Sequence, residues 1–260
     1  MAPPSRSSAG RRRLRRIRIT GWTALSSLIV TIIGFLVWAS TPYPEQPEPI
    51  RDLLTRSDIT VDAGPDHITV GPATSEGPLA GEGLLFFPGA RVNPHAYATT
   101  FADTVAATGL SVTIVRPWWN LAITDPRDLT DFQYLSDAEF TGVGGHSMGG
   151  VKACEIAAEH ELQRLVLMAS YCATDLSGGS LDVLSLSGSN DLLVDPVAVD
   201  DARQLLPDTT REVNLEGLNH ASFGDYGPQA GDGEAGVSRA EAIVAITEEL
   251  VSSLHETSRD

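Results

Sequence analysis

Cysteine and lysine are nearly absent from this sequence, and positive charge is scarce beyond its first 40 residues. Cys154 and Cys172 are the two cysteines, which are too few for a disulfide framework or a cysteine-based metal cluster. We expect two separate small buried thiols, with pairing as the alternative if this part of the chain lies outside the cell. The His, Asp and Glu residues show no zinc-ligand spacing, and the glycine-rich stretch at residues 144–147 lacks the lysine of a phosphate-binding loop. The sequence therefore predicts neither a metal nor another cofactor.

The charges are distributed very unevenly. Residues 1–40 contain seven arginines and no acidic residue, whereas all 34 acidic residues follow, so the rest of the chain carries a formal charge of about −23. A body this acidic is repelled by the phosphate backbone of nucleic acids. We therefore expect no nucleic-acid partner, and we expect the body to be soluble.

The first 39 residues resemble a membrane anchor. A run of arginines at residues 11–18 is followed by an uncharged apolar stretch at residues 21–39 with tryptophans near both ends. Nineteen helical residues come close to the ~30 Å thickness of the hydrocarbon core, and flanking arginines keep their side of a span in the cytoplasm. We expect a basic cytoplasmic tail over residues 1–20, an uncleaved transmembrane helix over residues 21–39 and a body outside the cell. The alternative is a signal peptide cleaved after Ala39, which would release a secreted body.

A proline-rich linker is expected next. Four prolines fall within residues 41–49, a composition that favours extended polyproline geometry and holds the following domain away from the membrane. We place the linker at residues 40–55 and one folded domain at residues 56–256, a length with ample material for a hydrophobic core.

Short apolar strands alternate with helices through that domain. A hairpin is expected at residues 59–61 and 67–70. Further strands are expected at residues 84–87, 111–115, 141–145, 165–169, 181–186 and 211–215, and helices at residues 97–108, 151–159, 197–206 and 238–254. Continuous apolar strands that alternate with helices predict an α/β fold, with a mostly parallel sheet covered by helices on both faces.

One motif on this pattern points to chemistry. Residues 145–149 read Gly-His-Ser-Met-Gly, which matches the Gly-x-Ser-x-Gly nucleophile elbow between a strand and a helix. The sharp turn leaves no room for side chains two residues before and after the serine, so both positions need glycine. Ser147 is therefore the candidate nucleophile. The alternative is a serine without a catalytic role in a glycine-rich turn.

Acid and base candidates follow two later strands. Ligands of a parallel sheet collect at the carboxyl ends of its strands, and Asp191 and His220 each come just after a strand. Asp195 is a rival acid, although its place before Pro196 is typical of a helix N-cap. His220 is preferred because it alone follows the last strand; the other histidines are His67, His95, His146, His160 and His255.

With these residues in order, the chain resembles the alpha/beta-hydrolase superfamily, whose triad runs Ser, Asp, His along the chain. The resemblance covers roughly residues 83–254 and is specific at the elbow, at residues 188–191 (Gly-Ser-Asn-Asp) and at residues 217–220 (Gly-Leu-Asn-His). Among hydrolases the chain is most similar to small bacterial enzymes with little or no lid, related to dienelactone hydrolase. The resemblance implies a three-layer alpha/beta-hydrolase fold, to which the N-terminal transmembrane helix is added.

The implied chemistry is acyl transfer through a serine. Asp191 would fix the tautomer of His220, which would accept the proton of Ser147. The expected oxyanion donors are the backbone N–H of Met148 and, by resemblance, that of Ala90, although residues 87–90 read Phe-Pro-Gly-Ala and not His-Gly-Gly-Gly. Trp118 and Trp119 follow another strand and are candidates for lining the substrate pocket, with packing as the alternative.

The sequence thus predicts a serine hydrolase that cleaves an ester or related acyl bond of a small molecule. Residues 125–140 are too few for a large helical lid, so we expect an open site. Acyltransferases and cofactor-free haloperoxidases share this fold and triad, and a non-catalytic binding or scaffold module on the same fold is the alternative from another class.

Overall fold

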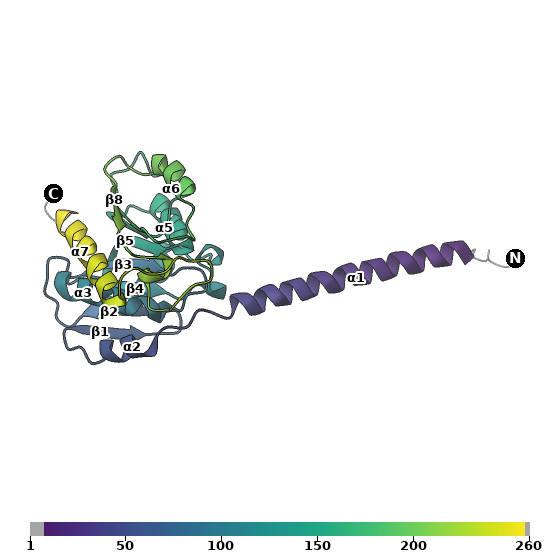
Figure 1. Cartoon of the computed structure of the whole chain (residues 1–260), viewed down its shortest axis with the longest axis horizontal. Helices are drawn as coiled ribbons and strands as arrows, with labels where there is room; N and C mark the ends of the chain where they lie inside the picture. The colour runs from purple at the N-terminus through teal and green to yellow at the C-terminus, as the bar shows by residue number, and fades with distance from the viewer. Residues whose placement is uncertain (1–7, 258–260) are drawn as a thin grey trace. The chain divides into compact units, whose positions relative to one another are not determined.

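A computed structural model describes the backbone of residues 8–257 and the side chains of residues 18–255 (Figure 1). The chain forms two compact units, Met1–Thr41 and Pro42–Asp260. The first unit is the helix α1, Ser8–Ala39. Its stretch Arg18–Ala39 has 22 residues and contains an 18-residue window with a mean hydropathy of 1.9. The stretch is long and apolar enough to cross a membrane, as a signal sequence would also be. The helix begins before the apolar stretch because Arg and Leu are good helix formers.

The expected extended linker is partly helical. Backbone geometry is extended at Gln46, and Pro47 then begins the short helix α2, Pro47–Leu53. The first turn of a helix tolerates proline because its N–H groups have no partner within the helix. The segment before α2 is also not a free spacer, because Tyr43 forms a parallel bridge with Val92 of the body.

The body is built on one eight-stranded sheet in the order β1-β2-β4-β3-β5-β6-β7-β8. The strands β1 and β2 form the expected antiparallel hairpin, β2 is also antiparallel to β4, and all other neighbours are parallel. The strands are Ile59–Ala63 (β1), His67–Pro72 (β2), Glu82–Phe87 (β3), Ser111–Val115 (β4), Glu139–His146 (β5), Arg164–Met168 (β6), Asp182–Gly188 (β7) and Arg211–Leu215 (β8).

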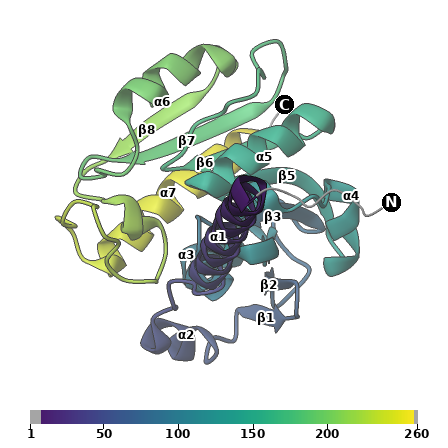
Figure 2. The same cartoon turned by 90° about the vertical axis from the view of Figure 1, so that its right-hand side faces the viewer.

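Helices cover both faces of the sheet, as the continuous apolar strands predicted. Successive side chains of a strand point to opposite faces. In β3, Leu84 and Phe86 accordingly belong to one core cluster, with residues of α3 and α7, while Leu85 and Phe87 belong to the other, with residues of α5. The helices are Ala98–Thr108 (α3), Leu129–Phe132 (α4), Met148–Glu159 (α5), Pro196–Ala202 (α6) and Arg239–Thr257 (α7). Figure 2 shows α5 and α6 on the opposite side of the strands from α7.

The helix expected over residues 151–159 begins earlier, at Met148, and the one expected over residues 238–254 is Arg239–Thr257. A 3-10 turn adjoins each of the other two expected helices. The helix expected over residues 97–108 is preceded by the 3-10 turn η1, Pro94–Tyr97, and ends where Gly109 adopts a φ of 78°. A left-handed residue ends a helix at low cost when it is glycine. The helix expected over residues 197–206 is α6 followed by the 3-10 turn η5, Arg203–Leu205.

The expectation of two separate thiols is wrong. Cys154 on α5 and Cys172 in the loop after β6 form a disulfide, with their Cα atoms 5.6 Å apart. Both residues are buried against the same side of the sheet, so the fold brings together two positions that are 18 residues apart in the chain. The bond ties the helix that follows Ser147 to the loop beside it.

Candidate active site at the carboxyl edge of the sheet

Ser147 occupies a strained turn between β5 and α5. Its φ and ψ are 53° and −125°, a region that residues other than glycine adopt rarely and at a cost of about 1–3 kcal/mol. A Cβ atom on Gly145 would lie 2.2 Å from the backbone of Gly149, and a Cβ on Gly149 would lie 2.0 Å from the carbonyl oxygen of Phe87. Both glycines are therefore sterically required, as the motif predicted. The carbonyl of Met168 in β6 fixes the turn by accepting the N–H of Ser147 at 2.9 Å.

Asp191 and His220 are hydrogen-bonded to each other. Asp191 lies in the turn after β7, and His220 begins the 3-10 turn η6, His220–Phe223, after β8. Nδ1 of His220 lies 2.8 Å from Oδ2 of Asp191, and both side chains are buried. The other oxygen of Asp191 accepts the backbone N–H groups of Leu193 and Val194 at 2.8 and 3.1 Å. The contact places the aspartate so that it holds the imidazole in one orientation.

The charge of Asp191 is stabilised by these partners. Burial raises the pKa of Asp191, but the hydrogen bond and charge of His220 lower it, and so do the two backbone amides. The net pKa lies below the ordinary value of an aspartic acid, so the carboxylate is ionised at neutral pH.

Asp195 and most other histidines have different roles. Asp195 is the N-cap of α6, as its place before Pro196 indicated, and accepts the N–H of Val197 at 3.0 Å. Three histidines contact polar groups elsewhere in the body: His67 contacts Asp62, His160 contacts Asp128, and His95 contacts Asn93. His160 and Asp128 also group with Glu159 within 4.8 Å, but His160 and Asp128 already bond to each other, and we assign that group no ligand role.

His146 is the histidine that packs against the candidate site. Its ring lies 4.5 Å from the ring of His220, centroid to centroid, and its Nδ1 lies 2.8 Å from the hydroxyl of Tyr97. The Tyr97 oxygen also accepts the backbone N–H of Gly89 at 3.0 Å, so its own proton is directed to Nδ1 of His146. Burial lowers the pKa of His146 well below its ordinary value, and the neighbouring His220 lowers it further. A neutral His146 does not repel a positive charge that develops on His220.

The two expected oxyanion donors lie on adjacent segments. Met148 is the first residue of α5, so its N–H has no acceptor within the helix. Ala90 follows Gly89 in the turn after β3, and the close approach of Gly149 to Phe87 shows that this turn packs directly on the elbow. The hydrogen bond from Gly89 to Tyr97 holds the same turn in place.

Two residues near the site were missed from the sequence. Ser170 donates its hydroxyl to the carbonyl oxygen of Ser147 at 2.6 Å; it stands just after β6, so the search for polar residues past strand ends could have found it. Asp232 accepts the backbone N–H groups of His220 and Ala221 at 3.1 and 2.9 Å. Asp232 lies in a loop without strand or helix, and no pattern in the sequence marks it.

Trp118 and Trp119 lie on the 3-10 turn η2, Trp118–Asn120, just past the end of β4. Their side chains are about half exposed, 52% and 49%, so they are not packed in the core. Their turn is joined to the oxyanion side of the site because the N–H of Arg91 donates to the carbonyl of Asn120 at 2.7 Å.

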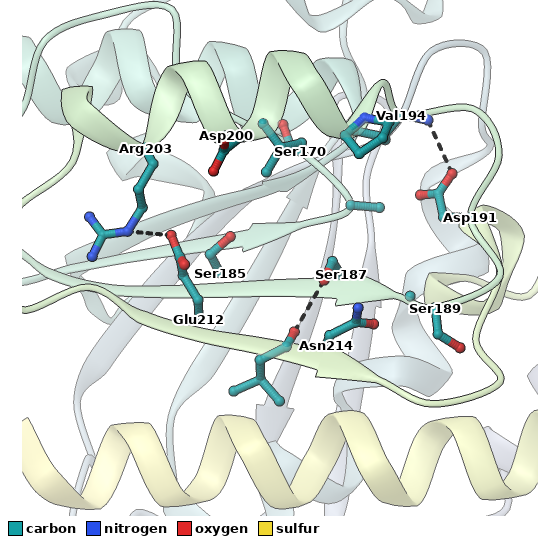
Figure 3. Close-up of a pocket in the computed structure, with 15 residues that line it drawn as sticks. Ser170, Ser185, Ser187, Ser189, Asp191, Val194, Asp200, Arg203, Glu212 and Asn214 are labelled. Carbon is teal, nitrogen blue, oxygen red and sulfur yellow. Dashed lines mark hydrogen bonds and ion pairs between the residues drawn. The ribbon is translucent and has the colours of Figure 1, made fainter.

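A polar cavity of about 510 Å³ lies beside Asp191, between α6 and the strands β7 and β8 (Figure 3). Arg203, the first residue of η5, and Glu212 on β8 form an ion pair at 2.5 Å along its wall. Ser185 and Ser187 of β7 line the cavity (Figure 3), but neither Ser147 nor His220 lines it. We therefore do not place the reacting bond of a substrate there.

Comparison with known proteins identifies the family. The family model of the alpha/beta hydrolase family matches residues 83–243, more than half of the chain. The chain belongs to the alpha/beta hydrolase family. A search of curated proteins finds no match.

Solved structures resemble this hydrolase in fold. The esterase domain of a Rhodothermus marinus protein gives a TM-score of 0.53 at 12% identity, over 76% of this chain and 98% of that one. A predicted CIB-like hydrolase from Thermoplasma acidophilum gives 0.51 at 14% identity, over 75% and 99%. A lidless a/b serine hydrolase from Xanthomonas campestris gives 0.48 at 16% identity, over 78% and 95%. The family match over residues 83–243 confirms the alpha/beta-hydrolase fold expected from the sequence.

Proposed function

We propose that this hydrolase cleaves an ester or related acyl bond of a small molecule. Ser147 is the nucleophile, His220 is the general base, and the carboxylate of Asp191 orients His220. The observation that carries the proposal is the 2.8 Å contact between His220 and Asp191 beside a strained serine turn. The imidazole of His220 also lies next to that turn, because its ring packs on His146, the residue before Ser147.

The reaction follows from the acidity of the groups. A serine hydroxyl is too weakly acidic to attack an ester unaided. Asp191 accepts the Nδ1 proton of His220, which leaves Nε2 free to accept the proton of Ser147 as its oxygen attacks the carbonyl carbon. The imidazolium then gives this proton to the leaving alcohol, and an acyl-enzyme remains on Ser147. Water, activated by His220 in the same way, releases the acid and restores the serine.

The negative charge on the carbonyl oxygen needs donors that are already in place. We assign the backbone N–H groups of Met148 and Ala90 to this role, since they lie on adjoining segments beside Ser147. The start of α5 adds the positive end of a helix dipole. The loss of one such donor typically lowers kcat by about 10²–10³.

The connection over residues 125–140 contains α4 and a 3-10 turn, each of three or four residues, so it supports the open site expected from the sequence. Trp118 and Trp119 are proposed as contacts for the substrate. Acyl transfer to another acceptor and cofactor-free halide oxidation use the same triad, and a binding module would not need the triad.

We infer that the body works outside the cytoplasm, with α1 as a single-pass anchor and the arginine-rich N-terminus inside. The disulfide between Cys154 and Cys172 supports this location, because disulfides persist in oxidising compartments. Secretion after cleavage at the end of the apolar stretch is the alternative. Protease added to intact cells should digest a body that is anchored outside the cell. Protection of a cell-bound body would contradict the outward orientation.

A fluorophosphonate probe tests the chemistry, because it reacts covalently with an activated serine. The full chain in detergent should be labelled at Ser147 and should hydrolyse p-nitrophenyl acetate. Ser147→Ala should abolish both signals, while Ser177→Ala, at an exposed serine that bonds Asp175, should leave both unchanged. Unchanged ester turnover in Ser147→Ala would reject the proposed nucleophile, and absence of both signals in the unmodified chain would favour a binding module.

A further inference from the structure

Exposed apolar side chains border the candidate site on two sides. Trp118, Trp119 and Ile123 belong to the connection after β4, and Leu192 and Leu193 belong to the connection after β7; exposed fractions range from 36% for Leu193 to 71% for Leu192. We call these five residues the apolar rim. In the sheet order, β4 and β7 each lie two strands from β5, which carries Ser147. At about 4.8 Å between strands, the two parts of the rim lie roughly 10 Å to either side of the nucleophile.

The tryptophans of the rim are held outward by a fixed backbone. Trp119 and Asn120 have φ values of 57° and 55°, and a bulky residue in this left-handed region is uncommon and costs free energy. The turn is held by the bond from the Arg91 N–H to Asn120 and by the buried carboxylate of Asp125, which accepts the N–H of Trp118 at 3.2 Å. The exposure of these rings is therefore built into the folded loop.

The chain also enters the body at this same edge of the sheet. Tyr43 donates its N–H to Arg91 and accepts the N–H of Asn93, and Gln46 donates to Asp225 at 2.7 Å. Residues 91–93 directly follow the oxyanion turn, and Asp225 directly follows η6 and its neighbour Gly224. Four peptide steps separate Tyr43 from Ala39, the last residue of α1, and can span at most about 14 Å. An anchor that ends at the membrane surface would thus keep the site edge within reach of the lipid.

We propose that the apolar rim docks on the lipid bilayer, and that the site therefore takes acyl groups from amphiphilic esters held in that bilayer. The inference rests on the proposed hydrolase function and on α1 as an anchor. Tryptophan is favoured at the interface between lipid and water, and apolar side chains gain free energy when they leave water. No lid has to open, because the rim itself replaces water with lipid around the site. The acidic body restricts docking to membranes of low negative charge, since anionic headgroups repel it.

Brominated lipids test the docking directly. The chain has four tryptophans, so Trp22→Phe and Trp38→Phe leave Trp118 and Trp119 as the only fluorophores of this kind. The full chain with these changes is reconstituted in phosphatidylcholine vesicles, with or without brominated acyl chains. The brominated lipid should quench the rim fluorescence, and inclusion of phosphatidylglycerol should weaken the quenching. If the brominated phosphatidylcholine does not quench the fluorescence of Trp118 and Trp119, the docking is overturned, whether or not the chain is an active hydrolase.

Paired variants test the substrate class. Ile123→Ser combined with Leu192→Ser removes one aliphatic group from each side of the rim, and Tyr134→Ser combined with Val244→Ser removes groups that are 73% and 54% exposed elsewhere. The rim pair should lower both the quenching and the hydrolysis of a long-chain ester embedded in the vesicles, the latter about tenfold. Turnover of water-soluble p-nitrophenyl acetate should be unchanged, and the control pair should behave like the unmodified chain.

Three outcomes separate the ideas. Equal loss for both esters, or no loss for the embedded ester, would overturn the proposed substrate class. The full chain in detergent could also be a dimer that the rim pair dissociates, with no quenching by lipid in the parent. This result would show that a second copy covers the rim, and it would overturn the lipid proposal. No turnover of either ester by the unmodified chain would reject the hydrolase function, while the quenching experiment would still decide the docking.

Discussion

Replacement of Asp191 by asparagine offers a sharp test, because the hydrogen bonds of this side chain fix how an amide would sit. One oxygen of Asp191 accepts two backbone N–H groups, and the other faces Nδ1 of His220. An asparagine would keep its oxygen on the two N–H groups, since the flipped amide would leave two donors facing its NH₂, at about 1–3 kcal/mol each. Its NH₂ would therefore point at Nδ1 of His220.

That orientation reverses the tautomer of the imidazole. Nδ1 would become the acceptor, the ring proton would move to Nε2, and Nε2 could no longer take the proton of Ser147. In serine proteases the same replacement lowers kcat by about 10⁴, equivalent to about 5 kcal/mol in the barrier. We expect a loss of this size for Asp191→Asn in p-nitrophenyl acetate hydrolysis by the full chain, with little change in KM.

Asp195→Asn is the matched control. Asp195 caps α6, and asparagine caps helices about as well as aspartate, so its turnover should stay within about twofold of the parent. If the kcat of Asp191→Asn lies within tenfold of the parent value, and its thermal unfolding transition is unchanged, the proposal that Asp191 sets the tautomer of His220 is refuted. If Asp195→Asn instead suffered the large loss, the acid would have to be reassigned.

Three further predictions concern the surroundings of the site. Asp232→Asn should lower kcat about 10- to 100-fold at nearly constant KM, because one amide oxygen cannot replace the carboxylate on both N–H groups at the start of η6; unchanged kcat would reject this positioning role. Joint replacement of Cys154 and Cys172 by alanine should lower the free energy of unfolding by about 3 kcal/mol for a loop of this length, and urea unfolding in detergent measures the change, with a loss below about 1 kcal/mol contradicting it. The pKa of His146 is lower in the folded chain than in the unfolded chain, so the unfolded chain binds this proton first as pH falls. The free energy of unfolding should therefore decrease below about pH 6.5, by at most ~1.4 kcal/mol per pH unit. His146→Asn should lack this component in urea unfolding between pH 5 and 7, and an identical pH dependence in both proteins would count against it.

The sequence by itself determined the order of elements and the position of most chemistry-bearing groups along the chain. Apolar strands that alternate with helices leave few arrangements other than a covered parallel sheet, and the glycines around Ser147 are required by the steric limits of the turn. Helix ends were less predictable: α2 and η5 depend on the contacts of a few residues, and the linker is fixed by a bridge to Val92 that no local pattern shows.

Tertiary structure decided which distant groups meet. Cys154 and Cys172 pair because α5 and the loop after β6 pack on one side of the sheet, a proximity that cysteine spacing does not encode. The sequence placed Asp191 and His220 past strand ends, but the direct contact between them, and the support of His220 by Asp232, depend on how three loops fold over the edge. Local sequence sets backbone preference through sterics and periodicity, whereas contacts between loops depend on where the whole sheet brings them.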